Sequence, residues 1–222
     1  MQRNINFSEG EHYHIYNRGV EKRDIFVEER DYERFMKLLF VANGTKAFEF
    51  RDIKDKSIHE IDRGEPLVAI GAYVLMPNHF HILVKEIQEG GISKFMEKLG
   101  TGYSSYFNRK YKRSGTFFEG NFKAKHADSD EYLKYLFAYI HLNPVKLIQS
   151  DWKENGIRHA VKARKYIEEY KYSSYVEYVG VKREAELLLT RKEFPEYFEE
   201  THEFKDFVND WLEFHAEAEH VV

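Results

Sequence analysis

The stretch LVAIGAYVLMPNHFHILV, residues 67–84, decides the fold that this sequence predicts. Its first half is a continuous apolar run typical of a buried strand, and the Met-Pro-Asn that follows favours a turn. Its second half predicts another strand, which returns antiparallel to the first. Successive side chains of a strand point to opposite faces, so His79 and His81 share one face while Phe80 and Ile82 lie on the other.

This pair of histidines is a candidate start for a metal site. Two neutral imidazoles held side by side are suitable ligands for a divalent cation. The same pattern also fits two hydrogen-bonded or solvent-facing histidines on a half-buried strand, and a chain with eleven histidines produces such pairs by chance. The His-x-His pair therefore needs support from elsewhere in the sequence.

Composition indicates a packed globular protein. The chain has 222 residues, of which 42% are hydrophobic and 16% aromatic, enough for one full core or a core with an appendage. The absence of cysteine excludes disulfides and thiolate zinc sites. The N-terminus lacks the pattern of a secretory signal, and no window approaches the roughly 18 apolar residues of a membrane span. We expect a soluble, cytoplasmic protein without a membrane partner.

The distribution of charge is more informative than the formal net charge of −4. Residues 92–125 hold eight Lys or Arg against two Glu, interleaved with Tyr and Phe, whereas residues 196–222 hold nine acidic residues against one Lys. Cations for phosphates beside aromatic rings for unstacked bases are typical of a surface that binds single-stranded nucleic acid. A solvated charged face would give a similar run of basic residues.

Local patterns on either side of the hairpin predict the other elements. The polar segment 43–66 is read as a hairpin or an inserted loop, and Pro144 ends the last helix of the core. Ser93 is a candidate N-cap, as is Asp128 or Ser129. The remaining elements are expected to be a strand at 13–17, a helix at 28–42, a helix from about 93 to 109, an extended segment at 115–127 and a helix at 130–143.

The helix expected at 130–143 holds the second candidate group. Tyr139 and Asn143 are four residues apart, so they share a face of the helix about one turn from each other. A phenol can attack phosphorus, and an amide oxygen can complete a His-His-oxygen site suited to magnesium or manganese. The same stripe also fits a core-facing aromatic ridge that ends in an Asn cap.

Four segments, taken together, resemble a known family: YHIYNRG from residue 13, AYVLMPNHFHILV from residue 72, SSYFNRKYKRSGTFFEGNFKA from residue 104 and DSDEYLKYLFAYIHLNPVK from residue 128. In order and spacing they resemble the single-tyrosine HUH transposases, in particular the REP-associated tyrosine transposases and their insertion-sequence-200-like relatives. The resemblance covers about residues 11–150.

The resemblance implies a fold and an activity. The fold would be α+β, a ferredoxin-like antiparallel sheet with helices packed on one face, plus a helical C-terminal extension. The domains would be 1–155 for the HUH single-tyrosine transposase or nuclease and 156–222 for the acidic extension. The activity would be that of a metal-dependent single-stranded DNA endonuclease and strand transferase, which forms a 5′-phosphotyrosine intermediate on hairpin-containing DNA. The protein would be a monomer or a homodimer.

The resemblance also implies roles for single residues. His79, His81 and Asn143 fall on the metal ligands, for Mg²⁺ or Mn²⁺, and Tyr139 falls on the nucleophile, with Tyr132 as the second choice. A further group of basic residues is expected to contact DNA: Arg18, Arg109, Lys110, Arg113, Lys123 and Lys125.

Two departures and two alternatives stay open. The segment 43–66 is longer than the connection expected in the family, and the acidic part 182–222 has no recognised counterpart.

The main alternative is a domesticated, non-catalytic protein that binds DNA hairpins. The second alternative is a phosphoesterase that uses the His-x-His pair on a substrate other than DNA. Within that class, nucleotidyl hydrolases with a His-x-His-x-His run are disfavoured because Leu83 stands at the third position.

Overall fold

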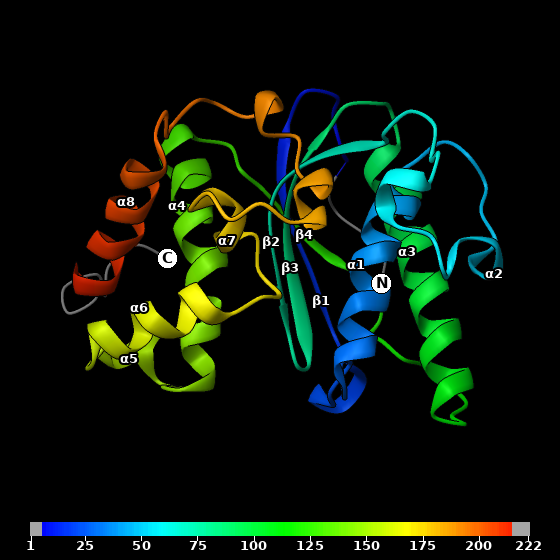
Figure 1. Ribbon diagram of the computed structural model, residues 1–222, viewed down its shortest axis with the longest axis horizontal. Helices are drawn as coiled ribbons and strands as arrows, with labels where there is room; N and C mark the ends of the chain where they lie inside the picture. Colours follow the sequence, from blue (N-terminus) through cyan, green and yellow to red (C-terminus); the bar gives the residue numbers. More distant parts are fainter. Residues whose placement is uncertain (1–5, 215–222) are drawn as a thin grey trace.

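Four strands form one antiparallel sheet, seen edge-on at the centre of Figure 1. The computed structural model describes residues 6–214. Its strands are β1 (His12–Arg18), β2 (Val68–Met76), β3 (His79–Glu86) and β4 (Lys123–His126). They lie in the order β2-β3-β1-β4, and every neighbouring pair is antiparallel. With helices after β1 and β3, this is the βαββαβ arrangement of a ferredoxin-like fold. The predicted α+β class is confirmed.

Helices cover both faces of the sheet, which corrects the expectation of one covered face. α1 (Glu29–Ala42) and α3 (Gly91–Lys110) pack on one face, to the right in Figure 1. α4 (Asp130–Leu142) packs on the opposite face against β2 and β3. The second face is covered because β2 is buried along its whole length, on both sides. A strand that is apolar on both faces requires two apolar layers.

The alternation along β3 divides its side chains between these two layers. Phe80, Ile82 and Val84 join the core under α1 and α3, whereas Leu83 joins the core under α4. His79 and His81 therefore lie on the α4 side of the sheet, as the period of two requires. Tyr139 packs against this second core. One helix thus covers the face that presents the two imidazoles.

The ends of α4 are set by its own sequence. The hydroxyl of Ser129 accepts a hydrogen bond from the Tyr132 N–H, so Ser129 is the N-cap, as one of the two predicted candidates. Asn143 is the C-cap, and Pro144 opens the 3-10 turn η3 (Asn143–Leu147) that follows. For α3 the prediction differs, since Gly90 rather than Ser93 is the N-cap. Gly90 has a φ of 71°, a conformation that glycine adopts without strain.

The segment 43–66 is an inserted loop and not a hairpin. It holds two short helical turns, α2 (Phe50–Ile53) and η2 (Ile58–Glu60). The buried side chain of Asn43 anchors the loop to the first residues of β2, because its amide accepts from the N–H groups of Leu67 and Val68 and donates to the Val68 carbonyl. These bonds close the loop beside α1, away from α4.

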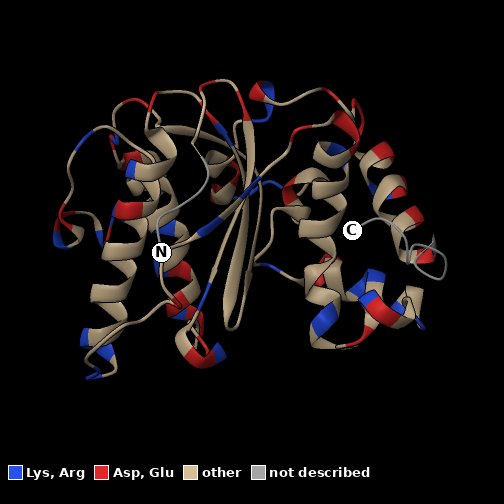
Figure 2. Cartoon of the chain, turned by 180° about the vertical axis from the view of Figure 1, so that it is seen from behind, with Lys and Arg blue, Asp and Glu red and all other residues tan. Residues whose placement is uncertain are grey.

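The C-terminal part completes the layer around α4. It is joined to β2 by backbone hydrogen bonds, from the Leu75 N–H to the Tyr172 carbonyl, from the Ser174 N–H to the Tyr73 carbonyl and from the Thr190 N–H to the Ile70 carbonyl. Figure 2 shows several acidic residues along its last helix. Its elements are α5 (Trp152–Asn155), α6 (Ala160–Glu169), α7 (Tyr175–Tyr178), η4 (Glu184–Leu188), η5 (Arg191–Glu193) and α8 (Thr201–Phe214), while η1 (Val20–Lys22) follows β1.

The boundary at residue 155 between a nuclease domain and an extension stays a prediction. The last acidic residues of the predicted extension, at 215–222, lie outside the described residues. Among residues 6–214, no helix is long and apolar enough to cross a membrane.

Because the imidazole of His141 is fully buried, we expect the folded protein to lose stability in acid. It lies 2.7 Å from the Ser174 hydroxyl, and burial lowers its pKa to about 3. Protons therefore bind the unfolded chain in preference to the folded one as pH falls below about 6.5, so stability is lost toward pH 3. We expect the free energy of unfolding to fall less steeply between pH 6 and 4 in His141→Gln than in the wild type, by about 1.4 kcal/mol per pH unit.

Chemical denaturation at a series of pH values measures these slopes. Glutamine preserves a polar partner for Ser174 without a titrating group, and the other buried histidines are present in both proteins. If the free energy of unfolding changed equally steeply with pH in both proteins, His141 would not be a source of the acid sensitivity.

Candidate active site

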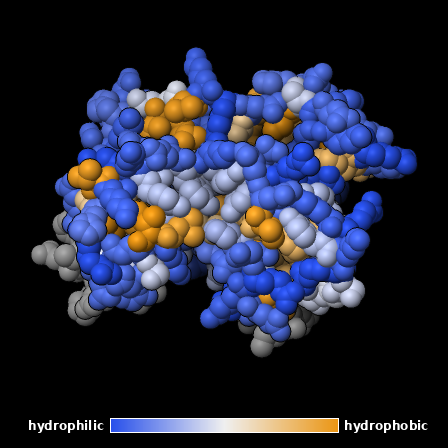
Figure 3. Space-filling view, turned by 60° about the horizontal axis from the view of Figure 1, so that its bottom comes forward, coloured by the Kyte–Doolittle hydropathy of each residue, from blue (hydrophilic) through white to orange (hydrophobic). Residues whose placement is uncertain are grey.

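A cavity of about 610 Å³ opens where β1 ends and β3 begins. This end is at the bottom of Figure 1, and Figure 3 brings it forward as a mainly hydrophilic surface with smaller apolar patches. The walls come from β1, the β2–β3 turn, the C-terminal end of α4, η3 and α5. The residues that line it include Arg18, Asn78, His79, His81, Glu119, Lys123, Tyr139, Asn143, Lys146 and Lys153.

The structure brings both predicted histidine ligands into this cavity. The rings of His79 and His81 have centroids 5.0 Å apart and are nearly perpendicular, at 87°. His79 Nδ1 lies 2.6 Å from the Asn78 side-chain oxygen, and His81 Nδ1 lies 2.8 Å from His14 Nε2. Nδ1 of each ring is therefore in a hydrogen bond within the protein.

Both imidazoles are neutral at physiological pH. Burial, followed by the nearby charges of Lys146, Lys153 and Arg18, lowers the pKa of His79 to about 4. Burial also lowers the pKa of His81 well below its ordinary value, and the adjacent His14 and His79 lower it further. A metal ligand must be unprotonated, so this environment prepares the two rings for a cation.

Tyr139 faces the same cavity from α4. Its ring packs edge-on against His81 and His14, with centroids 5.6 Å apart in both cases. Lys153 of α5 donates a hydrogen bond of 2.9 Å to the Tyr139 hydroxyl. Tyr132, the second choice for the nucleophile, does not line the cavity; it lies under the ammonium group of Lys125 at 4.3 Å.

Asn143 lines the cavity one turn beyond Tyr139. Its side chain is buried, and its Nδ2 donates to the Tyr139 backbone carbonyl at 2.7 Å. With Nδ2 in that bond, the amide oxygen is the atom that a hard cation would use. Two neutral imidazoles and an amide oxygen are a donor set that fits Mg²⁺ or Mn²⁺. In the described chain no cluster of three or more His, Asp or Glu is arranged for a metal, so the site would depend on this mixed set.

Comparison with known proteins concerns the sequence segment and the fold that hold this cavity. Residues 55–143 match the family model described as "Transposase IS200 like". The predicted resemblance is confirmed. A solved structure described as "Structure of the REP associates tyrosine transposase bound to a REP hairpin" is similar with a TM-score of 0.53, at 13% identity over 88% of each chain. At that identity the likeness shows a shared fold alone. No curated protein matches the chain.

Part of the site lies outside the segment that matches the IS200-like family. His14 precedes the matched residues, and Lys146 and Lys153 follow them. The sequence offered one signal for Lys146, which stands three residues after Asn143 in the same motif. His14 lies within YHIYNRG, another of the four segments, but its contact with His81 joins distant parts of the chain. For Lys153 the sequence offered no signal.

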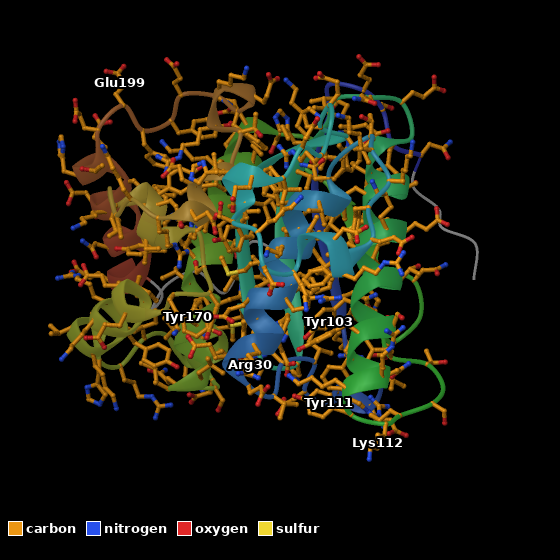
Figure 4. The ribbon with its side chains drawn as sticks, turned by 45° about the vertical axis from the view of Figure 1, so that its right-hand side comes forward. Arg30, Tyr103, Tyr111, Lys112, Tyr170 and Glu199 are labelled. Carbon is orange, nitrogen blue, oxygen red and sulfur yellow. The ribbon has the colours of Figure 1, made fainter. Side chains whose placement is uncertain are left out.

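The six predicted DNA-contacting residues lie in three places. Lys123 and Arg18 line the cavity, where Arg18 forms an ion pair with Glu119. Lys125 is two residues further along β4 and covers Tyr132. Three others do not line the cavity: Arg109 and Lys110 end α3, and Arg113 follows it, next to Lys112, which Figure 4 labels together with Tyr111.

Lys110 is part of a buried polar cluster. Its ammonium group contacts the Asp31 carboxylate at 2.5 Å and the Glu28 carboxylate at 2.6 Å. Asp31 is fully buried and also accepts from the hydroxyls of Tyr106 and Tyr111. Burial raises the pKa of Asp31, but the bonds from Lys110 and the two tyrosines outweigh it and hold the pKa below its usual value. Lys110 therefore stabilises the α1–α3 layer.

Replacement of Lys110 tests this structural role. Lys110→Met retains the aliphatic stem but leaves the buried Asp31 carboxylate without its cation, so we expect a loss of about 2 kcal/mol in the free energy of unfolding. Urea denaturation measures the loss. The neighbouring exposed Arg109→Met should change it by less than about 0.5 kcal/mol. Similar values for the two variants would contradict the structural role.

Proposed function

We propose that this protein is a metal-dependent endonuclease and strand transferase for single-stranded DNA that carries a hairpin. The observation that supports the proposal is the convergence of Tyr139, His79, His81 and Asn143 on one cavity within one chain. The hairpin is suggested by the similar structure, which was solved with a REP hairpin. A self-contained site agrees with the contact between the Tyr139 and His81 rings.

The reaction follows from the groups that face the cavity. His79, His81 and Asn143 would hold the cation, which when bound supplies positive charge for the oxygens of the scissile phosphate. The Tyr139 hydroxyl attacks phosphorus and loses its proton to solvent. A bond forms between the tyrosine oxygen and phosphorus, and the bond from phosphorus to the 3′ oxygen breaks. The products are a 5′-phosphotyrosine and a 3′-hydroxyl, so rejoining needs no external energy source.

Lys153 is suited to assist the nucleophile. A phenol with an ordinary pKa of about 10 is mostly protonated at pH 7. The ammonium group of Lys153 donates to the Tyr139 oxygen, so it stabilises the negative charge that this oxygen acquires as its proton leaves. In the reverse reaction it stabilises the same oxygen as the leaving group.

Basic side chains around the cavity provide a path for the DNA backbone. Lys123 and Arg18 come from the sheet side, whereas Lys146 and Lys153 come from the helical side. Phosphates that lie between these two groups would be neutralised on both sides of the scissile bond. The roles of Arg109, Lys110, Arg113 and Lys125 in DNA binding stay predictions.

Replacement of the tyrosine tests the proposal directly. Tyr139→Phe removes the nucleophilic oxygen and retains the ring, so we expect complete loss of the covalent protein–DNA adduct and hairpin affinity within about twofold of the wild type. Denaturing gel electrophoresis of labelled hairpin DNA with Mn²⁺ detects the adduct. Tyr132→Phe is the matched control and should form the adduct normally. Binding without any adduct in the wild type would instead favour a non-catalytic hairpin-binding protein.

Replacement of Lys153 tests its assistance to Tyr139. A charge-assisted hydrogen bond contributes about 1.5–3 kcal/mol, so Lys153→Met should slow adduct formation by about tenfold or more under single-turnover conditions. Lys153→Arg should recover part of the rate. The exposed Lys165→Met on α6 removes the same charge away from the cavity and should react at the wild-type rate. Equal rates for the two Met variants would exclude a specific role of Lys153.

A further inference from the structure

The Nδ1 atoms of both proposed histidine ligands are engaged by neighbouring side chains that no comparison assigns to the site. His79 Nδ1 is 2.6 Å from Asn78 Oδ1, and His81 Nδ1 is 2.8 Å from His14 Nε2. A neutral imidazole carries one proton, on Nδ1 or on Nε2, and only the nitrogen without the proton can bind a cation. The partners of Nδ1 therefore decide which nitrogen is free.

The tautomer of His79 follows from the orientation of Asn78. The Asn78 amide nitrogen donates to the Lys22 backbone carbonyl at 3.1 Å, so the amide oxygen is the atom turned toward His79. An amide oxygen can only accept a hydrogen bond. His79 Nδ1 must then carry the proton, which leaves the lone pair on Nε2.

His14 acts on His81 from the adjacent strand β1. It is buried on the same face of the sheet, and its ring stacks on His81 with centroids 4.9 Å apart. In a bond between two neutral imidazoles, one nitrogen donates and the other accepts. If His81 Nδ1 donates to His14 Nε2, the lone pair of His81 is on Nε2. The reverse arrangement would place the proton on His81 Nε2 and prevent coordination through it.

We propose that Asn78 and His14 are positioning residues that hold His79 and His81 as Nδ1–H tautomers, with both Nε2 atoms available for the cation. This inference rests on the proposed function, because it concerns the same metal site. A side chain that hydrogen-bonds the other ring nitrogen of a metal-binding histidine fixes the orientation of the ring. Loss of such a partner typically weakens metal affinity by about 10–100-fold. The MPN turn of β2–β3 is then part of the site and not only a connection.

The first test is the tautomer itself. Long-range ¹H–¹⁵N NMR of the metal-free protein distinguishes Nδ1–H from Nε2–H imidazoles. We expect His79 and His81 to be Nδ1–H tautomers, and His81 to lose this state in His14→Leu. An Nε2–H signal for either ring in the wild type would overturn the proposal for that ring.

The second test is Mn²⁺ affinity without DNA, measured by electron paramagnetic resonance of the free ion. We expect His14→Leu and Asn78→Leu each to bind Mn²⁺ about 10–100-fold more weakly than the wild type. His14→Gln and Asn78→Asp each retain an acceptor for Nδ1–H and should recover most of the affinity. His12→Leu is the matched control, since His12 lies on the same strand and contacts Phe194 instead.

The outcomes separate this inference from the proposed function. If His81→Ala binds Mn²⁺ as the wild type does, the metal site of the proposed function is wrong. If His81→Ala loses Mn²⁺ while His14→Leu and Asn78→Leu bind normally, the metal site stands and the positioning role is overturned. Thermal unfolding of each variant identifies loss of folding, and the exposed position of the Asn78 bond to Lys22 makes Asn78→Leu the milder of the two substitutions.

Discussion

The alternation of side chains along β3 is the constraint on which the rest of the structure depends. Phe80, Ile82 and Val84 enter the core under α1 and α3, which fixes the register of the strand, and the same register turns His79 and His81 toward α4. A shift of one residue would exchange the two sets and bury the imidazoles among phenylalanines. The chemistry of the cavity is thus set by the packing of the opposite face, where no side chain of the proposed site lies.

The sequence predicted the parts of the site that short-range periodicity controls. His79 and His81 follow from a period of two, and Tyr139 and Asn143 from a separation of four on a helix. It also predicted the order of strands and helices through α4, because each element has its own pattern and its own end signals, such as Ser129 and Pro144.

The remaining features depend on contacts between distant segments. Lys153 reaches Tyr139 only because α5 folds back beside α4, and His14 reaches His81 only because β1 and β3 pair. All basic residues of the stretch 92–125 were equally good candidates for DNA contacts in the sequence. In the structure Lys110 forms an ion pair with Asp31, whereas Lys123 lines the cavity. The sequence analysis expected helices on one face of the sheet only. The sequence of a single strand such as β2 does not specify which helix will pack on its other face.

The position of β4 has a consequence for how this protein behaves in solution. Within residues 6–214, β4 is the outermost strand beside β1, and its two exposed side chains are Lys123 and Lys125. A strand edge with free backbone groups invites another chain to extend the sheet, and lysines along such an edge repel that addition. The opposite edge is already closed by Tyr172 and Ser174. Lys123 and Lys125, whose charges are suited to attract a phosphate backbone, therefore also disfavour aggregation through this edge of the sheet.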